Sequence, residues 1–263
     1  MKGITMPLKP LTGNGSRLNL PSLGLSLRVL FTGYLIVASI GLISAGGQLL
    51  MTHGMADGHF GLSVDDVVYS YYGNRENSKL EVKLNGSMKD KATVQERAEI
   101  IKWVRTGSTE AEWQSTIQPI INQNCARCHG GIAGLPDFTT FEGIKVVAKV
   151  DEGASVSDLT RLSHIHLFGI SFIFFFICLI FSLTIGINPA LKAAAIGAPF
   201  LFLIVDILSW WLTKWYPSFA YMTIIGGLCY NLAAAFMILT SLYQMWILPW
   251  RKGKFDANAW IDE

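Results

Sequence analysis

The stretch LFGISFIFFFICLIFSLTIGI, residues 167–187, contains no charged side chain. A helix needs about 20 apolar residues to cross the hydrocarbon core of a bilayer, so this stretch predicts a transmembrane helix. Three further stretches have the same character: residues 29–51, residues 193–213 with the single charge of Asp206, and residues 221–248. Pro189 and Pro217 fall in the short breaks between the last three stretches, where proline is a natural helix stop. The sequence therefore predicts an all-α protein with four transmembrane helices.

The overall composition agrees with a membrane protein. The 263 residues are 51% hydrophobic and only 15% charged, whereas a soluble domain carries about 25% charged residues. This composition argues against a wholly soluble enzyme and against a disordered chain. The net charge of +2 lacks the strong basic bias of a nucleic-acid-binding protein. A lipid bilayer is the expected environment.

Basic residues flank the spans unequally. Both tails are basic, with Lys2, Lys9, Arg17 and Arg28 before the first span and Arg251, Lys252 and Lys254 after the last. Short basic segments stay on the cytoplasmic side, whereas long loops cross regardless of their charge. We therefore expect cytoplasmic tails (1–28 and 249–263), a first span that is an uncleaved anchor (29–51), an outer domain (52–163) and a three-helix transmembrane region (164–248).

The outer segment contains Cys125-Ala126-Arg127-Cys128-His129, the spacing of a haem c attachment site. Two thiols one helical turn apart can add to the two vinyl groups of one porphyrin, and the next residue presents its imidazole to the iron. A zinc site would need a second pair of ligands, and Cys178 and Cys229 lie in apolar stretches instead. Haem c is attached outside the cytoplasmic membrane, where the charge distribution independently places this segment. The pattern predicts one covalent haem c, with His129 as the proximal ligand.

Two amphipathic helices precede the haem motif. Residues 110–124 place Trp113, Ile117, Ile120 and Ile121 on one stripe, and Thr109 and Glu112 have capping-box spacing. Another capping box, Thr93 to Glu96, opens a helix that stops at Gly107. Its expected inward residues are Val94, Ala98, Ile101 and Val104. These two helices are expected to form a compact unit that holds the haem.

Residues 118–130, QPIINQNCARCHG, resemble the opening of a bacterial class I cytochrome c domain. The closing pattern of that family also occurs here, but before the haem motif: Ser78-Lys79-Leu80, Met88, the helix from Thr93, and the Trp103 to Gly107 ending. The order resembles a circular permutation over residues 62–163. The resemblance implies a small helical cytochrome c-like domain between the first and second spans, with Met88 as the distal iron ligand. It also implies a bacterial inner-membrane protein whose cytochrome domain faces the periplasm.

An internal repeat offers a rival interpretation. Residues 57–62 echo residues 128–135, and residues 78–88 echo residues 157–166. Under this interpretation His164 or His166 takes the place of the distal ligand.

The outer-face histidines and one buried acid remain open to several interpretations. Three interpretations are open for the histidines of the outer face, His53, His59, His164 and His166. They are interfacial imidazoles, or one of them is the distal haem ligand, or together they form a second site for haem or copper. Met51 and Met55 beside His53 would suit copper. Asp206 is either a proton or quinol site or, as we favour, an interhelical hydrogen-bond acceptor for Tyr221, Tyr230 or Asn231.

These features predict a membrane-tethered c-type cytochrome that carries single electrons on the outer face. We expect a subunit of a respiratory or oxidoreductase membrane complex, exchanging electrons with its other subunits or with a soluble cytochrome, rather than a stand-alone enzyme. One alternative is a quinol-oxidising membrane cytochrome, although the spans lack a histidine pair for haem b. Another is a haem-containing sensor or assembly subunit.

Overall fold

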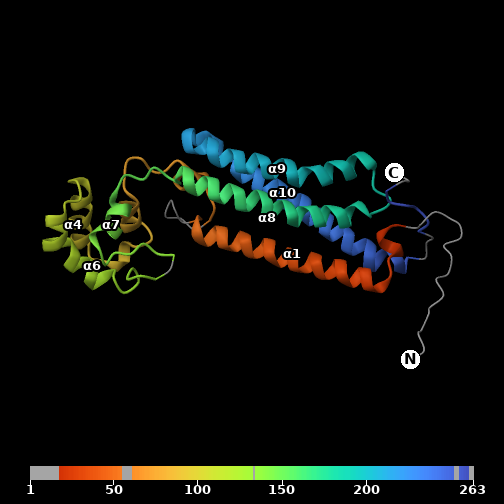
Figure 1. The fold of residues 1–263 in the computed structure, drawn as a ribbon, viewed down its shortest axis with the longest axis horizontal. Coiled ribbons are helices and arrows are strands. Elements are labelled where there is room, and N and C mark those ends of the chain that lie inside the picture. The colour runs from red at the N-terminus through yellow and green to blue at the C-terminus, as the bar shows by residue number, and fades with distance from the viewer. Residues whose placement is uncertain (1–17, 55–60, 133, 252–254, 261–263) are drawn as a thin grey trace, which may run out of the picture. The chain divides into compact units, whose positions relative to one another are not determined.

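The computed structural model describes residues 18–54, 61–132, 134–251 and 255–260, and every element named in these ranges is a helix (Figure 1). Four helices are long and apolar enough to cross a membrane. They are α1 (Leu25–Thr52), α8 (Val156–Ser182), α9 (Pro189–Trp215) and the run Pro217–Trp250, which comprises η4 (Pro217–Phe219), α10 (Ala220–Leu242), η5 (Tyr243–Ile247) and η6 (Leu248–Trp250). The prediction of an all-α protein with four candidate transmembrane helices is confirmed.

The start of α8 lies earlier than the apolar pattern predicts. The helix begins at Val156 because the Ser155 hydroxyl accepts a hydrogen bond from the Asp158 backbone N–H, which satisfies a free donor of the first turn. His164 and His166 therefore lie inside this helix and do not open it. The expected boundary at residue 163 therefore falls inside α8 and not at its start.

The chain divides into two compact units, and each is described by itself. The first comprises residues 1–39, 172–200 and 231–263. Side-chain amides tie its chain segments together, since Asn19 donates to the carbonyls of Phe255 and Ala257, and Gln244 exchanges two hydrogen bonds with the Ile185 backbone. Cys178 is buried here, with its sulfur 3.9 Å from the sulfur of Met237, as expected for a packing residue.

The second unit comprises residues 40–171 and 201–230 and contains the segment between α1 and α8. That segment forms α2 (Val64–Tyr71), α3 (Lys79–Asn85), η2 (Lys89–Lys91), α4 (Val94–Arg105), α5 (Glu110–Glu112), η3 (Trp113–Ile117), α6 (Gln118–Asn124) and α7 (Phe141–Ala148). One apolar core joins α3, α4, α6 and α7, built from Leu80, Leu84, Ile100, Trp103, Trp113, Ile117, Ile121, Phe138, Ile144 and Ala148. The predicted helix over 110–124 is present as the consecutive elements α5, η3 and α6. Of its predicted stripe, Trp113, Ile117 and Ile121 are buried and Ile120 is partly buried.

The buried face of α4 differs from the predicted one. Ile100 and Trp103 are fully buried, whereas Val94 is 69% exposed. The large indole of Trp103 decides the orientation, because it packs against Trp113 and Phe141 and donates to the Thr109 carbonyl. Ile101 and Val104 are left at the edge of the core. The capping box of Thr93 and Glu96 is present as predicted.

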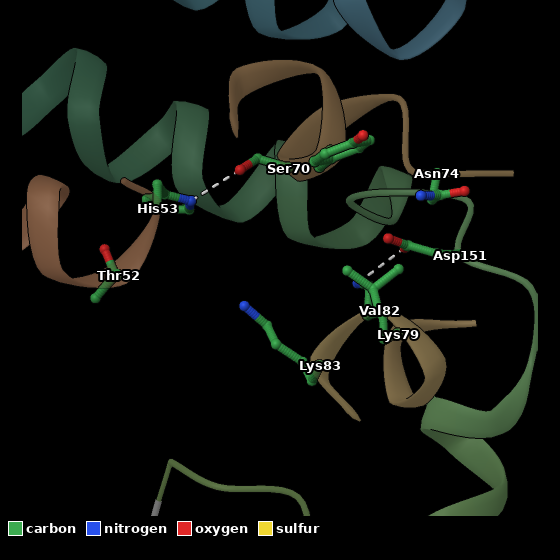
Figure 2. A pocket seen from close by; sticks show the side chains of 9 residues that line it. Thr52, His53, Ser70, Asn74, Lys79, Val82, Lys83 and Asp151 are labelled. Carbon is green, nitrogen blue, oxygen red and sulfur yellow. Dashed lines mark hydrogen bonds and ion pairs between the residues drawn. The ribbon is translucent and has the colours of Figure 1, made fainter. Parts of the chain in front are cut away.

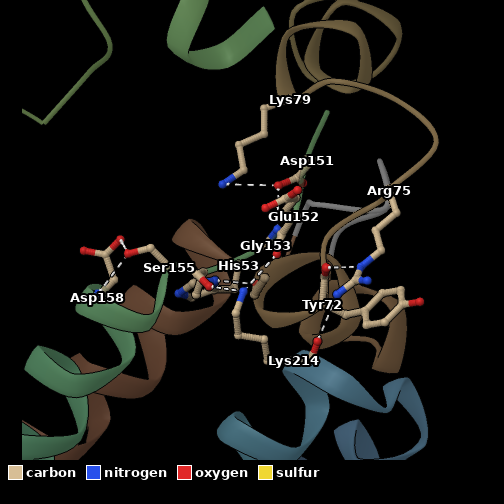
Figure 3. A network of polar contacts seen from close by, with 12 residues as sticks. His53, Tyr72, Arg75, Lys79, Asp151, Glu152, Gly153, Ser155, Asp158 and Lys214 are labelled. Carbon is tan, nitrogen blue, oxygen red and sulfur yellow. Dashed lines mark hydrogen bonds and ion pairs between the residues drawn. The ribbon is translucent and has the colours of Figure 1, made fainter. Parts of the chain in front are cut away.

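Two segments far apart in the sequence, residues 70–78 and 150–154, pair at the base of this domain and are called the neck. Backbone hydrogen bonds run from Arg75 N to Asp151 O at 2.9 Å, from Asp151 N to Asn77 O at 3.1 Å and from Ala154 N to Ser70 O at 2.9 Å. Lys214, near the end of α9, donates to the carbonyls of Glu152 and Ala154, and Arg75 donates back to the Lys214 carbonyl (Figure 3). The neck thus closes the domain and fastens it to α9.

Candidate functional site

The two cysteines of the motif lie on one helical turn that continues α6. The N–H of Cys125 donates to the Ile121 carbonyl at 2.8 Å, and the N–H of His129 donates to the Cys125 carbonyl at 2.9 Å. Both thiols are free, with Cys125 half-buried and Cys128 exposed. The structure therefore places Cys125, Cys128 and His129 together on one turn, the local geometry that covalent attachment of a porphyrin requires.

The imidazole of His129 is held by the loop that follows it. Its Nδ1 lies 3.0 Å from the carbonyl oxygen of Pro136, and its ring stacks on Phe138 with centroids 4.3 Å apart. Because a carbonyl only accepts, Nδ1 carries the proton, and in the neutral imidazole Nε2 then keeps its lone pair. This is the tautomer of a metal-binding histidine, with a backbone carbonyl orienting the ring. Pro136 and Phe138 are site residues that the sequence analysis did not identify.

The surroundings of the motif are apolar on one side. Cys125 packs against the core that contains Leu84 and Ile121, and this burial raises the pKa of its thiol. Two free thiols, an imidazole with an available Nε2 and an adjacent apolar core fit haem c.

The candidate distal ligands lie in different places. Met88 is 37% exposed and sits in the turn between α3 and η2, where its N–H donates to the Lys83 carbonyl. His164 is exposed beside Phe168. The half-buried His166 donates from Nδ1 to the Leu162 carbonyl and meets Trp210 edge-on. The two histidines thus face different sides of α8, as their spacing predicts. The identity of the distal ligand stays a prediction.

The proposed second metal site has no assembled ligand set in the part of the chain that the structure describes. No group of three or more histidine, cysteine or acidic side chains there is arranged to hold a metal ion. His59 lies outside the described residues. His53 bonds the Ser70 hydroxyl through Nδ1 at 2.9 Å, and burial lowers its pKa.

Asp206 lies in a buried aromatic cluster of the second unit. The residue is 4% exposed. Its carboxylate accepts from the indole N–H of Trp210 at 3.0 Å and is hydrogen-bonded to Tyr230 on α10. Tyr71, at the end of α2, stacks on the same indole with centroids 5.6 Å apart. This arrangement is the interhelical hydrogen bond that we favour for Asp206, with Tyr230 as the partner.

Trp210 is buried, whereas Trp215 and Tyr216, which follow it in the sequence, are exposed. Its position one helical turn after Asp206 lets the indole cover the carboxylate. That spacing was the available signal for this contact.

Comparison with known proteins finds one similarity. No curated protein and no solved structure matches the chain. Residues 138–252 match a family described as a transmembrane helical domain. The match begins at Phe138 and includes the last three candidate spans. The haem motif at residues 125–129 precedes this match. Over residues 138–252, the chain is therefore similar to a family of transmembrane helical domains.

Proposed function

We propose that this protein is a membrane-tethered monohaem c-type cytochrome that carries single electrons on the outer face of a bacterial inner membrane. The observation that carries the proposal is the turn of Cys125, Cys128 and His129, in which the Pro136 carbonyl holds His129 Nδ1. A bare motif match would not require that hydrogen bond. The bond leaves Nε2 as the available ligand atom.

The haem iron supplies one-electron chemistry when bound. The chain's own residues hold and tune that group. Cys125 and Cys128 anchor it, while Pro136 and Phe138 fix the ring plane of His129. The core beneath Cys125 excludes water on one side, and burial is one of the features by which a protein sets a haem potential.

The neck supports a role at the membrane surface. Lys214 and Arg75 join the domain to the end of α9 through three hydrogen bonds to backbone carbonyls. A cytochrome fastened in this way exchanges electrons with neighbouring subunits of a membrane redox complex or with a soluble cytochrome that visits them. This favours an electron-transfer subunit over a haem-containing sensor or an assembly subunit.

Quinol oxidation is the second candidate, and Asp206 is the residue that would take part. Its carboxylate is already covered by Trp210 and hydrogen-bonded to Tyr230. A quinol site needs an accessible proton acceptor, so the packing around Asp206 favours the electron carrier.

The haem content of the purified full-length protein tests this function. We expect a pyridine haemochrome spectrum of the c type with one haem per chain, retained after denaturation because the attachment is covalent. A metal count on the same sample should give one iron and no copper. A preparation matured with the haem c attachment machinery that holds no covalent haem would contradict the proposal.

The orientation of the outer domain gives a second measurement. Alkaline phosphatase fused at Gly107 should be active, and the same enzyme fused at Glu263 should be inactive, because the phosphatase folds only outside the cytoplasm. Reporter protein levels, measured by immunoblot, provide the control. The reverse pattern would place the haem motif in the cytoplasm, where haem c is not attached.

The distal ligand can be identified from spectra of two variants. We expect Met88→Ala to lose the near-infrared charge-transfer band of a methionine-ligated oxidised haem, and its potential to fall. The His164→Ala, His166→Ala double variant should retain both properties. The opposite pattern, with a native spectrum in Met88→Ala and a high-spin haem in the double variant, would assign the ligand to α8.

A further inference from the structure

A polar cavity of about 260 Å³ lies beside the end of α1 (Figure 2). Its walls come from the last residue of α1, from α2, from α3 and from the neck. It is lined by Thr52, His53, Tyr69, Ser70, Asn74, Lys79, Val82, Lys83 and Asp151. All of these residues belong to the second compact unit. The haem motif contributes none of them.

The charges around the cavity leave an excess of positive charge. Lys79 forms an ion pair with Asp151 at 3.3 Å, and the Asp151 side chain is 8% exposed. Lys83, one turn later on α3, extends into the cavity in Figure 2 and forms no ion pair within the described residues. Asp151 is the one carboxylate in the lining, and Lys79 already neutralises it. An anion is therefore the ligand that the cavity favours.

The hydrogen bond at His53 Nδ1 determines whether the second ring nitrogen, Nε2, donates or accepts. The Ser70 hydroxyl donates to the Asp66 carbonyl at 2.7 Å, so its oxygen accepts from His53 Nδ1. In the neutral imidazole Nε2 is consequently an acceptor. The cavity thus combines ammonium donors from α3 with an acceptor at the end of α1, a set that suits an anion carrying a hydroxyl group.

The position of the cavity favours a lipid. Thr52 is the last residue of a helix long enough to cross the membrane, so the cavity lies at the height of the polar layer, where lipid phosphates reside. Lysine side chains at this height are attracted to anionic headgroups. The volume is smaller than that of sites for drug-sized ligands, as expected for a headgroup whose acyl chains stay in the bilayer.

We propose that this cavity binds the phosphate of an anionic glycerophospholipid, with Lys83 and Lys79 as its cationic ligands and His53 Nε2 accepting from a headgroup hydroxyl. Such a lipid would contact both the end of α1 and α3, and would stabilise the position of the outer domain at the membrane surface. Free phosphate shares the same chemistry, and the test separates the two sources.

The test measures thermal unfolding of the full-length protein in detergent as phosphatidylglycerol, phosphatidylcholine or inorganic phosphate is added. A ligand that binds only the folded state raises the melting temperature, and at a given concentration a tighter ligand raises it further. Phosphatidylglycerol should raise it in the wild type, and phosphatidylcholine should not. Lys83→Ala should weaken the apparent affinity about tenfold, as expected for loss of one charge-assisted hydrogen bond. Lys83→Arg should keep most of the effect.

The exposed Lys89 of η2, which does not line the cavity, provides a matched control. Lys89→Ala should respond to phosphatidylglycerol like the wild type. Haem content serves as the folding control, because none of Cys125, Cys128, His129 and Met88 lines this cavity. Equal responses of Lys83→Ala and Lys89→Ala would overturn the proposal. So would an equal response to both lipids, or a response that inorganic phosphate reproduces in full.

Discussion

The Cys125→Ala, Cys128→Ala double variant is expected to lose covalent haem completely. Both thiols lie on the turn after α6, and in the proposed haem c site each would form one thioether to the same porphyrin. With neither thiol present, the iron–histidine bond alone would hold the group, and denaturation breaks that bond. Denaturing electrophoresis followed by haem-dependent peroxidase staining measures the loss, with an immunoblot for protein amount.

The chain supplies a matched control for this result. Cys178 and Cys229 are also free thiols, but they lie in α8 and α10 rather than in the motif. The Cys178→Ala, Cys229→Ala variant removes the same number of sulfurs and should stain like the wild type. Covalent haem in the Cys125, Cys128 double variant would show that the motif is not the attachment site.

The four spans could be predicted from the sequence because length and apolar character alone decide whether a helix can cross a bilayer. The inner face of η3 and α6 could be predicted equally well, since Trp113, Ile117 and Ile121 repeat at helical spacing. The buried face of α4 could not be predicted in this way. Both Ile100 and Ile101 fit an apolar stripe, and the packing of the Trp103 indole against Trp113 and Phe141 selected between them.

The candidate site could be predicted only in part from the sequence, for a similar reason. The motif gives Cys125, Cys128 and His129 through local spacing. The support of His129 depends on how the loop to Pro136 and Phe138 folds back, which no local spacing specifies. The pairing in the neck could not be predicted at all. The two segments that pair, near residues 73 and 153, are distant in the sequence, and they are joined by backbone hydrogen bonds that side-chain identity does not encode.

The second large effect is expected on the stability of the neck, in the variants Gly73→Ala and Gly153→Ala. Both glycines have positive φ, +85° and +71°, a conformation that costs an L-residue about 1–2 kcal/mol. An added Cβ would also lie 2.2 Å from a backbone oxygen, that of Asp151 for Gly73 and that of Tyr71 for Gly153. Neither oxygen can rotate away as a side chain would, so the paired segments must separate.

We expect each substitution to destabilise the outer domain by about 3 kcal/mol or more, since a backbone clash adds to the conformational cost. Limited proteolysis of the membrane-embedded protein should then cleave between α1 and α8 far faster than in the wild type. Gly107→Ala is the matched control, because Gly107 has φ +104° but open space around its Cβ position. It carries the conformational cost without the clash. If Gly153→Ala resisted proteolysis as well as Gly107→Ala, the close pairing of residues 70–78 with residues 150–154 would not be what holds the domain closed.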